Sequence, residues 1–95
     1  MTRPRCDLTA AWKALRRAFD EGGRGFDLRA AFAEDAGRFD RFSLEAPCVF
    51  ADLSKNRWDD ATRALLLDLA RERGLEARRD AMFAGEPINL TEGRA

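Results

Sequence analysis

The spacing of the apolar residues changes once along this chain, and the change limits how the chain can fold. On both sides of residues 42–53, apolar residues recur every three or four positions, as in amphipathic helices. Within "FSLEAPCVFADL" apolar and polar residues alternate instead, and Pro47 interrupts the run, which predicts a short β-hairpin over residues 42–53. Because a lone two-stranded hairpin is marginal in water, we expect its apolar face to lie on a helix or to join strands from elsewhere.

Two helices are expected before the hairpin. The first is predicted over residues 8–19, with Asp7 or Thr9 as its N-cap and the glycines of "GGRG" as the turn that ends it. The second begins at Leu28 behind the cap Asp27 and ends before Gly37. The residues expected to face the core are Leu8, Trp12, Leu15 and Phe19 in the first helix, Leu28, Ala31 and Phe32 in the second, and Phe39 and Phe42 after it.

Two more helices are expected after the hairpin. The third runs from about Asp60, which with Asp59 is expected to supply a cap rather than a metal site, to Gly74 as C-cap. The fourth covers residues 75–83 and is stopped by Gly85 and Pro87. The inward residues of the third helix are Ala61, Leu65, Leu66 and Leu69. The predicted fold class is mostly α with one short β-hairpin.

Composition narrows the classes of function. The 95 residues form at most one domain, and 17 basic side chains balance 17 acidic ones, so we expect no nucleic-acid or membrane partner. The chain has no histidine, which excludes a Cys/His zinc site and a Ser-His or Cys-His catalytic pair within it. No cofactor or metal is predicted. Without a signal peptide or membrane span, the expected location is cytoplasmic, where Cys6 and Cys48 are reduced thiols.

Two polar segments stand outside the helical pattern. "SKN" at residues 54–56 either shapes a turn, with Asn56 at positive φ or bonded to its own backbone, or forms a functional loop; the turn is the favoured interpretation. In "GEPINLTEGRA" at residues 85–95, Thr91 is a suitable N-cap and Glu92 suits a first helical turn. A few residues cannot hold a helix alone, so this end is either a frayed tail or the first turn of a longer helix.

The order of "LRAAFAEDAGRF", "FSL", "DLSKNR", "LLLDLA", "RDAMFAGEPIN" and "TEGRA" resembles the N-terminal region of the glucose-6-phosphate isomerase (phosphoglucose isomerase) family, most closely over residues 52–95. Leu53 departs from the family, which usually has an aromatic residue there. The resemblance implies a scaffold role for the matching positions, which are Ser54, Lys55, Asn56, Gly85, Glu86, Ile88, Asn89, Thr91, Glu92 and Arg94.

The resemblance also implies a larger enzyme. Residues 1–95 would be the N-terminal helical segment of a homodimeric α/β protein built from two SIS-type sandwich domains, which interconverts glucose 6-phosphate and fructose 6-phosphate through an enediol. Its catalytic glutamate, its ring-opening histidine and its phosphate-binding loop would all follow Ala95. No catalytic residue is therefore assigned in this chain. We expect it to be inactive alone, to pair with the remainder of the isomerase chain, and to meet sugar phosphate only in the complete enzyme.

The alternative is a stand-alone helical protein-interaction module, in which exposed Trp58, Met82 and Phe83 form a docking patch. We favour the isomerase, because a docking module has no reason to carry the family's motifs in the family's order.

Overall fold

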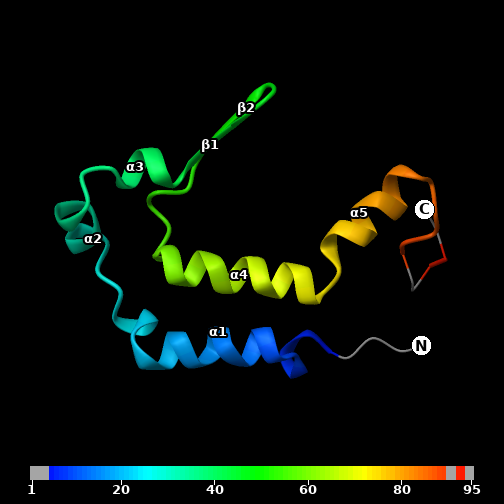
Figure 1. Ribbon diagram of the computed structural model, residues 1–95, viewed down its shortest axis with the longest axis horizontal. Coiled ribbons are helices and arrows are strands. Elements are labelled where there is room, and N and C mark those ends of the chain that lie inside the picture. The colour runs from blue at the N-terminus through cyan, green and yellow to red at the C-terminus, as the bar shows by residue number, and fades with distance from the viewer. Residues whose placement is uncertain (1–4, 90–91, 94–95) are drawn as a thin grey trace.

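The computed structural model describes residues 5–89 and 92–93, and its elements follow one another along an open, curved path (Figure 1). The order is η1 (Cys6–Leu8), α1 (Ala10–Glu21), η2 (Gly23–Gly25), α2 (Leu28–Glu34), α3 (Arg38–Arg41), β1 (Ser43–Ala46), β2 (Val49–Asp52), α4 (Asp60–Glu72) and α5 (Leu75–Phe83). The mostly helical fold with one antiparallel hairpin is as predicted. Helix α3 was not predicted, because four residues are too few to show a helical period.

The β1–β2 hairpin lies where the sequence period changes. Ser43 pairs with Asp52 at its open end and Ala46 pairs with Val49 beside the turn. Cys48 has a φ of 66°, and a proline followed by a residue with positive φ is the combination found in type II turns. The hairpin projects away from the helices and pairs with no other strand among the described residues (Figure 1).

Side-chain caps set the helix starts as expected. Thr9, rather than Asp7, caps α1 by accepting from the Trp12 amide at 3.2 Å. Asp27 caps α2 through the amides of the second and third helical residues, and Asp59 caps α4 by accepting from the Thr62 amide at 2.8 Å. Gly74 follows α4 with a φ of 71°, the left-handed conformation that a C-terminal glycine provides.

Helices α1 and α4 pack side by side and antiparallel, and this pair is the main tertiary contact of the structure (Figure 1). The Glu72 carboxylate at the end of α4 accepts hydrogen bonds from the amides of Ala10 and Ala11 at 3.2 and 2.7 Å. An acidic group at a helix N-terminus satisfies orphan N–H groups and complements the helix dipole. Glu72 therefore joins the start of α1 to the end of α4.

Several predicted core residues are less buried than expected. Leu65 and Leu69 are half-buried, but Ala61 and Leu66 are exposed, and so are Trp12, Phe19 and Phe32. Leu8 lies in η1 ahead of α1 and is 58% exposed, and Phe39 is 47% exposed. Among the apolar residues that the structure describes, only Ala11 and Phe42 are fully buried. These corrections share one cause: the helix faces point inward, but few elements lie opposite them.

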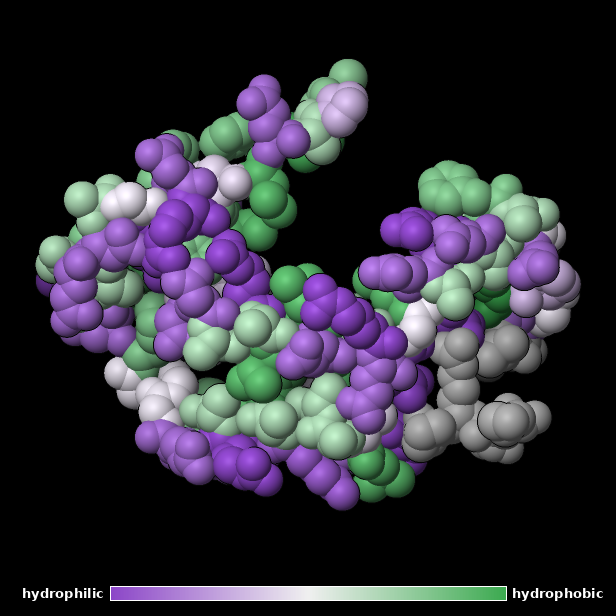
Figure 2. All heavy atoms as spheres, viewed as in Figure 1, coloured by the Kyte–Doolittle hydropathy of each residue, from purple (hydrophilic) through white to green (hydrophobic). Residues whose placement is uncertain are grey.

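The chain is also less compact than a folded domain of its length, because few of its elements pack against one another. Its radius of gyration is 16.8 Å, whereas a compact domain of this length has about 12 Å. Its accessible surface is 7574 Å², against about 5500 Å² for a folded monomer of this mass. Much apolar surface therefore lies open, as the green areas of Figure 2 show.

Candidate functional site

The segment that carries the Ser-Lys-Asn motif is held by a buried arginine. Arg38 of α3 is only 3% exposed, and its Nε donates to the Ser54 carbonyl oxygen at 2.8 Å. Its Nη2 donates to the carbonyl oxygens of Asn56 and Trp58, both at 2.9 Å. One planar guanidinium thus fixes three backbone positions of the loop between β2 and α4, which a shorter or more flexible cation could not do.

Aromatic rings complete the surroundings of Arg38. Its guanidinium lies 4.6 Å from the ring centre of Phe42, 5.5 Å from that of Phe32 and 5.6 Å from that of Phe26. The faces of aromatic rings attract cations, and the attraction grows when water is excluded. Carbonyl oxygens and ring faces together stabilise the buried charge.

Phe42 is the centre of this cluster. Its side chain is 1% exposed, and its ring centre lies 5.8 Å from that of Trp58. The guanidinium of Arg63 lies 4.6 Å from the same ring. Arg41 also lies near it and forms ion pairs with Asp35 and Asp60, and its hydrogen bond holds the pKa of Asp60 below the usual value.

Within the motif, the three side chains have different environments. Ser54 is 1% exposed, and both its hydroxyl and its amide donate to Oδ1 of Asp52, at 2.5 and 2.9 Å, so the pKa of Asp52 is lowered. Lys55 is exposed, with its Nζ 3.4 Å from Oδ2 of Asp52. The backbone N–H of Asn56 donates to the Leu53 carbonyl oxygen at 3.2 Å, as in a turn. Ser54 is thus a structural residue, while Lys55 and Asn56 face outward.

The favoured interpretation of residues 54–56 as a turn is confirmed by the hydrogen bond from the Asn56 backbone amide to Leu53, but two other statements about this loop are wrong. Asn56 does not have a positive φ, because Cys48 is the one non-glycine residue with a positive φ in the described part of the chain. Trp58 is half-buried rather than exposed, since it packs on Phe42 and its Nε1 donates to the Leu53 carbonyl oxygen at 3.1 Å. The docking patch proposed from Trp58, Met82 and Phe83 therefore lacks its tryptophan, although the other two side chains are exposed.

The second motif segment lies at the other end of the molecule, after α5 (Figure 1). Gly85 has a φ of 77°, and the amide of Glu86 donates to the Ala81 carbonyl oxygen at 3.0 Å, which ends the helix. Arg78 donates to the Ile88 carbonyl oxygen at 2.9 Å. The structure therefore does not bring the two motif segments together.

Asn89 begins the turn that leads into "TEGRA". Its Oδ1 accepts from the Glu92 amide at 3.3 Å, and its carbonyl oxygen accepts from the Gly93 amide at 2.7 Å. A side-chain oxygen that accepts from the amide three residues on is bonded as in an N-cap. The N-cap predicted at Thr91 and the motif position Arg94 lie outside the described residues.

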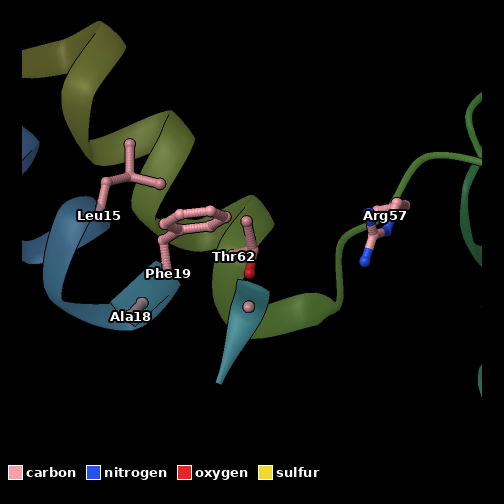
Figure 3. Close-up of a pocket in the computed structure, with 6 residues that line it drawn as sticks. Leu15, Ala18, Phe19, Arg57 and Thr62 are labelled. Atoms are coloured by element: carbon pink, nitrogen blue, oxygen red, sulfur yellow. The ribbon is translucent and has the colours of Figure 1, made fainter. Parts of the chain in front are cut away.

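An open pocket of about 320 Å³ lies where the end of α1 meets the start of α4 (Figure 3). It is lined by Leu15, Ala18, Phe19, Gly23, Arg57 and Thr62. Arg57 stands apart from the apolar group in Figure 3, and its Nη2 donates to the carbonyl oxygens of Arg24 and Phe26 at 3.3 and 2.9 Å. A mainly apolar wall with one hydroxyl offers no acid–base pair, so this pocket is a gap between helices rather than a reaction centre.

Over residues 5–89 and 92–93, no helix is long and apolar enough to cross a bilayer. The same residues contain no cluster of three or more cysteine, aspartate or glutamate side chains arranged to hold a metal ion.

Reasoning from sequence missed the residues that organise the site. Arg38 was not singled out, because a short aromatic stretch around an arginine does not distinguish a buried side chain from an exposed one. Glu72 and Arg57 were missed because their partners lie tens of residues away in the sequence.

Comparison with known proteins shows which class of proteins this chain resembles. A family profile described as "Phosphoglucose isomerase" matches residues 52–95, the range that holds both motif segments. Across all 95 residues, the chain is 68% identical to glucose-6-phosphate isomerase from Leptothrix cholodnii, 64% to that from Albidiferax ferrireducens and 62% to that from Polaromonas naphthalenivorans. The chain spans 17–18% of the length of these relatives.

The chain is similar to members of the phosphoglucose isomerase family. It matches the N-terminal part of these isomerases, in agreement with the resemblance inferred from "SKN", "GEPIN" and "TEGRA".

Proposed function

We propose that the complete polypeptide containing this chain interconverts glucose 6-phosphate and fructose 6-phosphate, in glycolysis and gluconeogenesis, and that residues 1–95 are its N-terminal scaffold. The observation that carries the proposal is the 68% identity to a glucose-6-phosphate isomerase over the whole chain. Aldose–ketose isomerisation needs a positioned base, a ring-opening acid and donors to a phosphate dianion. This chain has no histidine, and the wall of the pocket between α1 and α4 described above is mainly apolar, so we place the catalytic groups in the rest of the polypeptide.

The scaffold role is supported by how the family positions are used. The Ser54 hydroxyl donates to Asp52 at the end of β2 and the Ser54 carbonyl oxygen accepts from Arg38, while Gly85 and Asn89 shape the chain after α5. We propose the same role for the rest of the motif, which is Lys55, Asn56, Glu86, Ile88, Thr91, Glu92 and Arg94.

The proposal also extends to partners and location. The remainder of the isomerase polypeptide is the partner that covers the open apolar surface, the complete enzyme is a homodimer, and it works in the cytoplasm. The relatives, which are metabolic enzymes several times longer than this chain, support the first of these points.

A coupled assay tests the proposal. Fructose 6-phosphate is supplied, and the glucose 6-phosphate formed is oxidised by an added dehydrogenase, with NADP reduction as the readout. We expect turnover by the complete polypeptide and none above the no-protein control by residues 1–95. Turnover by the 95-residue chain would contradict the proposal that the catalytic groups lie outside it. An inactive complete polypeptide would contradict the proposal that it is an isomerase.

A further inference from the structure

One face of the β1–β2 hairpin is wholly apolar and largely exposed in the described structure. Leu44 lies opposite Ala51, and Ala46 lies opposite Val49. Directly opposite residues of an antiparallel pair point to the same side, so these four side chains share one face, here called the hairpin apolar face. Leu44 and Val49 are 60% and 58% exposed.

The other face of the hairpin is directed toward α3. Phe50 lies on that face, with its ring centre 6.1 Å from that of Phe39. At the base of the hairpin, the Ser43 hydroxyl donates to the Phe39 carbonyl oxygen at 2.6 Å. Since α3 occupies that side, the hairpin apolar face is turned away from it, and Figure 2 shows the hairpin standing clear of the helices.

The size of the face decides between kinds of partner. Two strands about 4.8 Å apart, each four residues long with a rise of about 3.4 Å, cover roughly 130 Å². A standard protein–protein interface buries about 800 Å² on each side. A second copy that bound only this face would therefore dissociate, whereas a surface on the same polypeptide is held at a high effective concentration.

We infer that the hairpin apolar face binds, in cis, an apolar surface on the remainder of the same isomerase polypeptide. This inference rests on the proposed function, because it takes this chain to be one part of a protein as long as relatives of which it spans 17–18%. The partner surface is an apolar helix or sheet face. Alanine at two of the four positions leaves room for its side chains to approach the strands closely.

Hydrogen exchange on the complete polypeptide tests the inference. We expect the amides of residues 43–52 to exchange at least about 100-fold more slowly than in an unstructured peptide, as in cooperatively packed elements. Ala46→Glu places a charge in the proposed contact and should remove most of this protection, because burying an unpaired carboxylate is strongly unfavourable. Glu45→Gln, one residue away on the opposite face, is the matched control and should retain the protection. Val49→Thr keeps a strand-forming shape and should give a partial loss.

Three outcomes would overturn the inference. Unprotected hairpin amides in the unmodified protein would show that nothing binds the face. Equal loss of protection with Ala46→Glu and Glu45→Gln would show that the apolar face has no special role. If Ala46→Glu instead separated a dimer into monomers in sedimentation, the partner would be a second subunit. The coupled assay on the unmodified protein is read separately, so that an active enzyme with an unprotected hairpin rejects this inference alone.

Discussion

Replacing Arg38 by methionine should be among the most damaging single changes in this chain. Methionine keeps most of the length and apolar character of the side chain but removes the hydrogen bonds to the carbonyl oxygens of Ser54, Asn56 and Trp58. A hydrogen bond to a charged group contributes about 1.5–3 kcal/mol, and a buried acceptor left unpaired costs about 1–3 kcal/mol. Part of the loop can move to reach water, so we expect a total loss of about 3–5 kcal/mol.

That loss is large for a chain of this size. A compact domain of 95 residues has a free energy of unfolding of about 5–14 kcal/mol, at roughly 0.05–0.15 kcal/mol per residue, and this open chain buries less apolar surface than such a domain. Urea unfolding followed by tryptophan fluorescence is a suitable assay, because Trp58 packs on Phe42 and bonds within the same loop. The urea midpoint of Arg38→Met should fall strongly.

The matched control is Arg79→Met on α5, where the arginine is exposed and, among the described residues, pairs with the adjacent Asp80. Surface ion pairs contribute at most about 1 kcal/mol, so this change should move the midpoint little. Equal shifts for Arg38→Met and Arg79→Met, or a loss below about 1 kcal/mol for Arg38→Met, would refute the reasoning that the guanidinium holds the loop.

Three further predictions use the same assay or its pH dependence. Leu69→Ala should cost about 1–3 kcal/mol, less than a fully buried leucine because Leu69 is half-buried, and exposed Leu75→Ala should cost clearly less. Glu72→Ala should cost about 0.5–2 kcal/mol, as for a lost cap, with exposed Glu76→Ala as the control; equal effects would contradict the capping role. The pKa of Asp60 is lowered in the folded chain, so its stabilising contribution is present above the unfolded pKa and is lost as pH falls through the folded pKa. Asp60→Asn should therefore weaken the acid dependence of stability, and an unchanged profile would contradict this.

The features predicted correctly from the sequence are local ones. Asp27 was identified as a cap, and Thr9 and Asp59 were each one of two candidates, because a cap bonds an amide two or three positions away. The hairpin was recognised because the change to alternating residues occupies one continuous stretch. Cys48 at positive φ could not be predicted, since cysteine is not a residue that favours this conformation.

What the sequence did not reveal depends on distant contacts. A helical period shows which residues share a face, but whether Leu66 or Phe19 becomes buried depends on what lies opposite, and here little does. For the site, the resemblance identified Ser54 and Asn89 by position. Their hydrogen bonds to Asp52 and Glu92 are local, whereas Arg38 bonds carbonyl oxygens 16 to 20 residues away, which no sequence pattern indicates.

The link between Glu72 and the start of α1 has a consequence for the order of folding during synthesis. Closing a loop of about 60 residues costs roughly 4 kcal/mol of chain entropy. At 5–20 residues per second, the ribosome needs about 3–12 s to make the residues that separate Ala11 from its capping carboxylate. During that time helix α1 lacks the Glu72 cap and the packing of α4, so its apolar stripe is exposed and can bind chaperones. Pulse-labelling hydrogen exchange during refolding should show α1 and α4 gaining protection in one phase, and earlier protection of α1 would contradict this dependence.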